Sequence, residues 1–123
     1  MHRELNQKFS SKNKLTNPAQ FDQVFKKNSK TLKTREFLFL STDNFMGKNR
    51  LGIIVGKKNV SLSVERNRLR RLIREGFRTI LPSRLGIDLV VLVRSGAKHN
   101  KNVWPSLKKL FLSVSNKEQG KNL

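Results

Sequence analysis

Arginine is the residue type in this chain whose number and spacing point to chemistry. Residues 64–78, VERNRLRRLIREGFR, contain six arginines and two glutamates, with apolar residues between them. Like charges on successive turns of a helix destabilise it unless an anion lies beside them. This is the spacing of Arg66, Arg70, Arg74 and Arg78. Guanidinium groups match phosphate oxygens in geometry, so we interpret the segment as binding a polyanion, in preference to the solvated face that a charged run usually forms.

The charge of the whole chain indicates the same class of partner. Of 123 residues, 27 are Lys or Arg and 8 are Asp or Glu, which gives a formal net charge of +19. A merely soluble basic domain is disfavoured, because such a charge destabilises the compact state through self-repulsion. Membrane surfaces and acidic proteins are polyanions too, but the high arginine content favours nucleic acid.

Several classes of protein are disfavoured by what the sequence lacks. There is no cysteine, which excludes a disulfide framework, thiolate catalysis and cysteine zinc sites. No run approaches the roughly 20 apolar residues of a transmembrane helix. Residues 1–14, MHRELNQKFSSKNK, lack the apolar region of a secretory signal. We therefore expect a cytoplasmic protein that has no membrane partner.

The chain is not expected to catalyse a reaction by itself. Its two histidines, His2 and His99, fall in a presumed arm and a loop, and its eight carboxylates are scattered. No HExxH, P-loop or GxGxxG motif is present. Metal-assisted cleavage of a phosphodiester needs several converging acids. We therefore predict no catalytic residue, no metal site and no cofactor bound by the protein itself.

The hydrophobic pattern predicts the helices that position the arginines. A short helix follows Asn17, a suitable N-cap, with Pro18 at its first position. The arginine segment forms an amphipathic helix over residues 64–81 that Pro82 ends, after a connection at 59–63 whose serines can cap it. Its predicted packed face consists of Leu69, Leu72, Ile73, Phe77 and Ile80, with Gly76 among them.

The strands and the last helix complete the predicted fold. Strands are expected at residues 35–42, 51–58 and 87–94, with a short extra strand near 29–34 and a last helix from Val103. This order, α–β–β–(β)–α–β–α, predicts an α/β (α+β) two-layer sandwich: a single sheet of three to four strands with helices packed on it. We expect a flexible basic N-terminal arm at 1–14, one α/β domain at 15–116 that binds nucleic acid, and a frayed tail at 117–123.

Aromatic residues provide a second candidate binding feature. Phe21 and Phe25 lie one turn apart on the first helix, and Phe37 and Phe39 share one face of the strand REFLFL. Core packing explains most of these four residues. The functional alternative is a platform on which unpaired bases stack.

Taken together, these stretches resemble the protein component of bacterial ribonuclease P. ERNRLRRLIREGFR (65–78) is similar to that family's "RNR" signature. It follows a strand that ends in Lys57 and Lys58, and the downstream strand lies at the expected distance. FDQVF (21–25) and the strand IDLVVLVR (87–94), with its Arg-Ser-Gly-Ala continuation, also fit. The resemblance covers about residues 15–112.

The resemblance implies a fold detail and a function that the residues alone do not. The fold would contain a left-handed β–α–β crossover, where the common rule expects a right-handed one. The protein would be a subunit of an endoribonuclease in which a catalytic RNA, with magnesium ions, removes the 5′ leader of precursor tRNA. It would stabilise the RNA's active form, support metal binding and contact the leader.

The resemblance also assigns residues to two surfaces. Residues expected to face the catalytic RNA are Arg66, Asn67, Arg68, Arg70, Arg71, Arg74 and Arg78. Residues expected at the leader-binding cleft are Phe21, Phe25, Phe39, Lys57 and Lys58. At position 40, where some relatives would have an aromatic residue, this chain has Leu40, so stacking there is not expected.

Two alternatives from other classes stay open on the sequence. A ribosomal or other structural RNA-binding protein would share the charge, the size and the missing cysteines. The ordered RNR-type motif and the FxxxF helix argue against it. A DNA-binding protein is compatible with an arginine helix in a major groove, but the element before that helix is a strand, so no helix-turn-helix is formed and DNA is not the expected partner.

Overall fold

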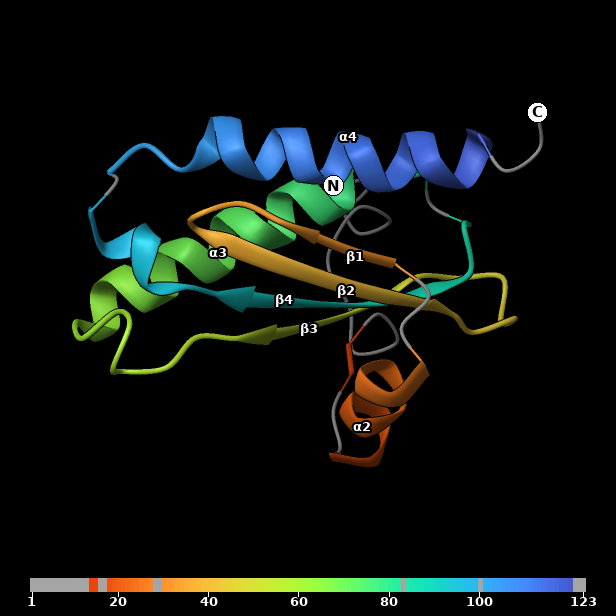
Figure 1. The fold of residues 1–123 in the computed structure, drawn as a ribbon, viewed down its shortest axis with the longest axis horizontal. Helices are drawn as coiled ribbons and strands as arrows, with labels where there is room; N and C mark the ends of the chain where they lie inside the picture. Colours follow the sequence, from red (N-terminus) through yellow and green to blue (C-terminus); the bar gives the residue numbers. More distant parts are fainter. Residues whose placement is uncertain (1–13, 16–17, 28–29, 83, 100, 121–123) are drawn as a thin grey trace, which may run out of the picture.

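The sequence folds into one four-stranded sheet with helices on both of its faces (Figure 1). The computed structural model describes residues 14–15, 18–27, 30–82, 84–99 and 101–120. The helices are α2 (Pro18–Lys27), α3 (Ser63–Ile80), α4 (Trp104–Gly120) and the short 3₁₀ helix η2 (Ser95–His99). The strands are β1 (Lys30–Lys33), β2 (Phe37–Asp43), β3 (Arg50–Ile54) and β4 (Ile87–Val93).

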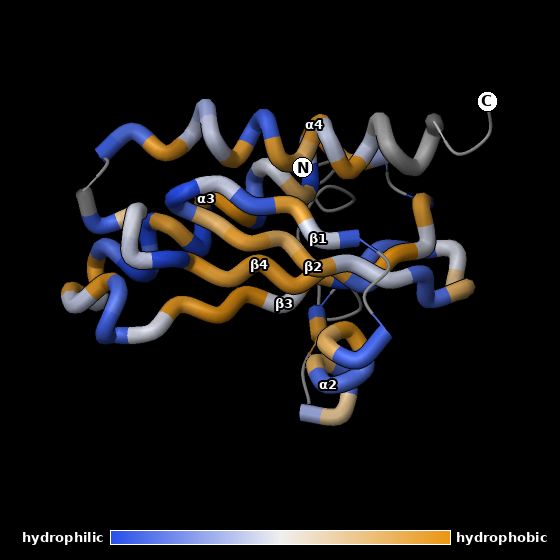
Figure 2. The backbone as a smooth tube through the Cα atoms, in the orientation of Figure 1, coloured by the Kyte–Doolittle hydropathy of each residue, from blue (hydrophilic) through white to orange (hydrophobic). Residues whose placement is uncertain are grey.

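The strand order places the last strand of the chain in the middle of the sheet. The order is β1-β2-β4-β3, with β4 antiparallel to β2 and parallel to β3. β4 reads IDLVVLV, and only Leu92 among these residues is not buried. Figure 2 shows β2 and β4 as largely hydrophobic segments. Such a continuous apolar run is what a strand covered on both faces requires.

The larger core lies between the sheet and the helices α3 and α4. Phe39 of β2 and Phe111 of α4 meet edge to face, with ring centroids 4.9 Å apart. Gly76 of α3 allows the same Phe111 ring to approach, since a Cβ at Gly76 would come within 2.5 Å of a ring carbon. This contact fixes how closely the two helices pack.

The opposite face of the sheet carries a smaller core under α2. Val24 of α2 is fully buried and packs with Leu15, Leu40 of β2 and Val90 of β4. Because side chains alternate along a strand, Leu40 faces α2 while its neighbour Phe39 faces α4. The two cores therefore share one sheet, and α2 covers only part of its second face.

The predicted α/β sandwich, with one sheet and helices packed on it, is confirmed, and the extra strand near 29–34 is β1. β3, α3 and β4 form the β–α–β unit to which the resemblance assigns a left-handed crossover. No helix among the described residues has both the length and the apolar character to cross a membrane.

Several predicted boundaries differ from the structure. The strand predicted at 51–58 is β3, which ends at Ile54, so Lys57 and Lys58 lie in the following turn and not at a strand end. The N-cap of α3 is Leu62, with no side-chain cap hydrogen bond, so the predicted serine cap is wrong. α4 continues to Gly120, so residues 117–120 belong to a helix rather than a frayed tail. Lys14 bridges to Leu51 at the edge of β3 and is therefore not part of a loose arm. Residues 1–13 and 121–123 of the predicted termini, and the predicted cap Asn17, lie outside the described residues.

Candidate nucleic-acid interface

The helix α3 separates its apolar and cationic residues on two faces, as the pattern predicted. Leu69, Ile73, Gly76 and Phe77 are buried. Leu72 and Ile80 pack against the same core and are partly buried. Burial of the apolar face supplies most of the stability of such a helix. The arginines are thereby held on the exposed side of a rigid element.

Two of these arginines lie beside α2 across the edge strand β3. Arg70 and Arg74 line a groove of about 160 Å³ together with Phe21 of α2 and Gly52 of β3. Gly52 lets the Phe21 ring lie against the strand backbone, because an added Cβ would be 2.6 Å from two ring carbons. The groove therefore combines an aromatic ring with two guanidinium groups, a pairing suited to a nucleotide base and its phosphates. The remaining lining residues are Lys14, Leu15, Leu51 and Ile53.

The second aromatic residue of α2 is exposed at the surface. Phe25 is 40% exposed and lies one turn from Phe21. Phe39, by contrast, is 1% exposed and is enclosed by the core against Phe111. Its assignment to the leader-binding cleft is therefore wrong, because the alternation of the strand directs it to the α4 side. Leu40 occupies the α2 side but is itself buried under the helix.

Arg66 stabilises the segment that leads into α3. Its Nη1 donates to the carbonyl oxygens of Val60 and Ser61, both at 2.9 Å. These bonds tie the connection before α3 to the first turn of the helix, where no side-chain cap is present. Arg66 therefore stabilises the entry to the motif helix, and its first contacts are with the protein's own backbone.

The acids of α3 pair with arginines three residues away. Arg68 Nε lies 2.9 Å from Glu65 Oε1, and Arg78 Nη2 lies 2.8 Å from Glu75 Oε2. Arg70 donates to the side-chain oxygen of Asn67 at 3.1 Å. Exposed pairs of this kind contribute only about 0–1 kcal/mol. A phosphate can therefore replace them at little cost. Arg71 is exposed and makes no ion pair or side-chain hydrogen bond with the other described residues.

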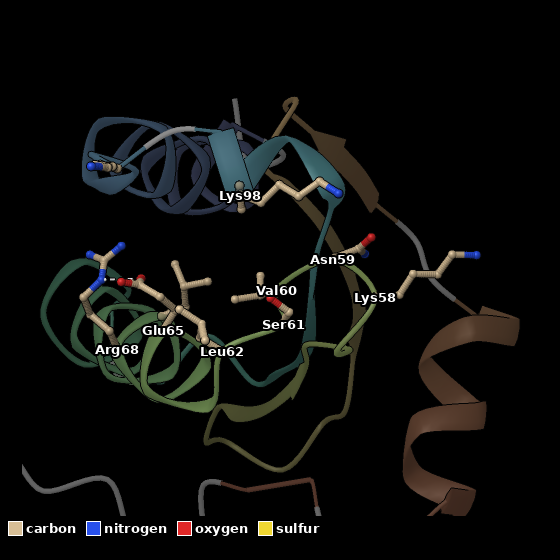
Figure 3. A pocket seen from close by; sticks show the side chains of 11 residues that line it. Lys58, Asn59, Val60, Ser61, Leu62, Glu65, Arg68 and Lys98 are labelled. Atoms are coloured by element: carbon tan, nitrogen blue, oxygen red, sulfur yellow. Dashed lines mark hydrogen bonds and ion pairs between the residues drawn. The ribbon is translucent and has the colours of Figure 1, made fainter.

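A larger pocket lies between the N-terminal part of α3 and the segment that contains η2 (Figure 3). We call it the α3–η2 pocket; its volume is about 630 Å³. Figure 3 shows Lys58 pointing away from the other labelled side chains, although its residue borders the pocket. Lys57 and Lys58 are both exposed in the turn that follows β3. The pocket is lined by Lys58, Asn59, Val60, Ser61, Leu62, Glu65, Arg68, Leu69, Ala97, Lys98 and Lys101.

The sequence reasoning missed this pocket and one buried ion pair. The basic loop at 97–102 was a signal for the pocket, but its distance along the chain from α3 hid the contact. Arg50 of β3 binds Asp88 of β4 through two hydrogen bonds of 2.8 Å, and Asn44 donates to the same carboxylate. The hydrogen bond to Asp88 raises the pKa of the Arg50 guanidinium, and burial opposes it. The pair joins neighbouring strands and serves the fold.

Comparison with known proteins shows to which family this chain belongs. The sequence matches the family model described as Ribonuclease P over residues 9–115. The chain belongs to this family. Membership makes it a subunit of ribonuclease P, an endoribonuclease of tRNA processing that contains an RNA partner.

Relatives and solved structures agree with this membership. The Ribonuclease P protein component of Pseudomonas fluorescens (strain Pf0-1) is 41% identical over 92 residues, which are 75% of this chain and 69% of that protein. That of Marinobacter nauticus is 40% identical over 113 residues, covering 89% and 83% of the two chains. The RNase P protein from Thermotoga maritima superimposes with a TM-score of 0.67 at 32% identity, over 85% of this chain and 96% of that one.

The acidic and histidine side chains of the described residues are scattered. They contain no group of three or more His, Cys, Asp or Glu side chains that could hold a metal ion. Asp88 is 2% exposed and engaged by Arg50 and Asn44, so its oxygens face protein donors.

Proposed function

We propose that this chain binds the catalytic RNA of ribonuclease P and the 5′ leader of precursor tRNA. The observation that carries the proposal is the groove in which Arg70 and Arg74 of α3 meet Phe21 of α2. The arginines neutralise phosphates, and the aromatic ring stacks on an unpaired base. Phe25, partly exposed one turn away, extends the aromatic surface.

The two surfaces have separate roles in this proposal. The exposed arginines of α3, with Arg71 and Arg78 among them, hold the catalytic RNA. The groove beside Gly52 receives the leader, which is single-stranded and therefore presents unstacked bases. Lys57 and Lys58 follow β3 and supply further positive charge near the strand end. The hydrolysis is assigned to the RNA with its magnesium ions, and the chain contributes binding and positioning.

Leader cleavage tests the proposal. A bacterial ribonuclease P RNA is incubated with precursor tRNA at low magnesium concentration, with and without the protein. We expect strong stimulation by the wild-type chain and little by Arg70→Ala/Arg74→Ala. Lys108→Ala/Lys109→Ala is the matched control, because it removes two exposed charges from α4 and leaves the groove intact.

The outcomes separate the proposal from its alternative. Stimulation that both double variants reduce equally would assign the effect to net charge instead of the groove. No stimulation by the wild-type chain, with RNA binding retained, would overturn the proposal in favour of a structural RNA-binding role. Melting temperatures of all three proteins show whether a variant has lost its fold.

A further inference from the structure

The α3–η2 pocket has a shape and a lining that the groove beside Phe21 does not share. Its inner wall is formed by core residues, since Val60, Leu69 and Ala97 are each less than 9% exposed. Leu62 is 61% exposed and adds apolar surface at the mouth. The pocket therefore offers an apolar surface to any molecule that enters it.

Polar groups surround this apolar surface. Figure 3 shows Arg68 and Glu65 at one end of the pocket and Lys98, from η2, on the side of Asn59. Arg68 bonds to Glu65 through Nε, so its two terminal nitrogens make no hydrogen bond to the other described residues. Asn59 donates its amide to the carbonyl of Val93 at 3.0 Å, which orients its side-chain oxygen. Lys101 adds a further cation to the lining.

The size of the pocket limits what it suits. A phosphate ion needs only a few donors on an open surface. This pocket has a volume of about 630 Å³, which lies within the range of small-molecule sites. A nucleotide has both parts that the lining matches: an anionic phosphate for one of the cations at its ends (Arg68, Lys98 and Lys101), and a flat base for the apolar wall. The oxygen of Asn59 can accept a hydrogen bond from a base amino or imino group.

We infer that the α3–η2 pocket binds a single unpaired nucleotide of the RNA partner. This inference rests on the proposed function for the existence of an RNA partner, and it adds a second RNA contact away from the leader groove. An unpaired nucleotide turned out of a loop or bulge enters such a pocket, whereas a nucleotide in a duplex does not. The pocket therefore recognises a position in a folded RNA.

Titration with mononucleotides tests the inference on the full chain. Each of the four ribonucleoside 5′-monophosphates is added to ¹⁵N-labelled protein, with inorganic phosphate as the comparison. We expect at least one nucleotide to shift the amide signals of Asn59, Ala97 and Lys98 and to bind about tenfold more tightly than phosphate. Equal affinity for phosphate, or shifts confined to residues around Phe21, would overturn the inference.

Two variants assign the binding to the pocket. Lys98→Ala/Lys101→Ala removes two cations of the lining, and we expect about tenfold weaker nucleotide binding. Lys108→Ala/Lys109→Ala changes the net charge equally and is expected to bind like the wild type. Equal losses in both would mean that the nucleotide responds only to overall charge, which would contradict the inference.

Leu62→Ser removes the exposed apolar side chain at the mouth of the pocket without a risk to the fold. Serine is a preferred N-cap residue and leucine is not, so this variant is expected to melt no lower than the wild type. We expect weaker nucleotide binding with unchanged phosphate binding. Leu112→Ser, an exposed leucine of α4, is the control. If Leu62→Ser bound nucleotide as the wild type does, the pocket would not hold a base.

The same variants distinguish this inference from the proposed function. In the leader-cleavage assay, the pocket variants are expected to reach the same maximal stimulation as the wild type. They should need a higher protein concentration to reach it. Normal cleavage at every concentration would overturn the pocket and leave the groove untouched. Failure of the wild-type chain to stimulate cleavage, with mononucleotide binding intact, would overturn the proposed function alone.

Discussion

Phe21 of α2 lies directly on the backbone of Gly52 in β3. An added Cβ at Gly52 would come within 2.6 Å of the ring and 3.2 Å of Leu15. The strand residue with no side chain thus creates the space that the aromatic residue fills. Since Arg70 and Arg74 line the same groove, the position of the Phe21 ring relative to the arginines depends on this one glycine.

Gly52→Ala is therefore expected to displace the Phe21 ring and weaken leader binding. The ring is only partly buried and can move, so the loss of stability stays near the low end of overpacking costs, about 1 kcal/mol. The measurement is holoenzyme affinity for precursor tRNA relative to mature tRNA. Gly56→Ala is the control, because nothing lies within 4 Å of an added Cβ there. A leader preference kept by Gly52→Ala would show that Phe21 does not contact the leader.

The salt dependence of the affinity for RNA should show how many RNA phosphates α3 neutralises. Each neutralised phosphate contributes roughly −0.7 to −0.9 to the slope of log affinity against log salt. Arg70→Ala/Arg74→Ala is expected to reduce the slope by about 1.4 to 1.8 if each arginine holds one phosphate. Filter binding at several salt concentrations measures this. An unchanged slope in the variant would place the two arginines away from RNA phosphates.

Arg66 and Arg71 should differ in their effects on stability. Arg66→Ala leaves the carbonyls of Val60 and Ser61 without their donor, and we expect a loss of about 1–2 kcal/mol in the free energy of unfolding. Arg71→Ala removes the same charge from an exposed position and should change stability by less than about 0.5 kcal/mol. Urea unfolding compares the two. Equal stabilities would show that the bonds of Arg66 to the loop contribute nothing to the fold.

Asp88→Asn is expected to destabilise the fold strongly. It leaves Arg50 partly buried without its carboxylate, and breaking a buried pair costs about 3–5 kcal/mol. The exposed Asp43→Asn, at the end of β2, serves as the control in the same urea unfolding experiment.

The pH dependence of the Arg50 contribution follows from the direction of its shift. The folded pKa of Arg50 lies above its unfolded value. The stabilisation is therefore fully present below the unfolded pKa and is lost only as the pH rises through the folded one. Between about pH 6 and 9 the Arg50 charge should add no pH dependence to the free energy of unfolding. A strong slope there that Arg50→Met removes would contradict this.

The elements of this fold were readable from the sequence because their patterns are local. The apolar residues of α3 recur at helical spacing, so both its packed face and its arginine face followed from the sequence. The run of β4 identified a strand buried on both sides. The pairing of β4 between β2 and β3 was not readable, since it joins segments far apart in the chain.

The site was predicted in part, and its errors have physical causes. Phe21, Arg70 and Arg74 meet in one groove, whereas Phe39 is enclosed by α4. Residue type alone does not show whether a phenylalanine lines a groove or packs in the core, because both places use the same aromatic side chains. The bonds of Arg66 to Val60 and Ser61 were not predicted, because the sequence does not reveal which backbone carbonyls a folded loop presents.

The central position of β4 has a consequence for synthesis of the protein. Both β2 and β3 pair with β4, whose last residue is Val93. A nascent chain that ends before this strand can form the β1–β2 hairpin, but β3 has no partner strand. The sheet therefore assembles only after about three quarters of the chain has left the ribosome. Until then, the arginine helix lacks the complete sheet on which its apolar face packs.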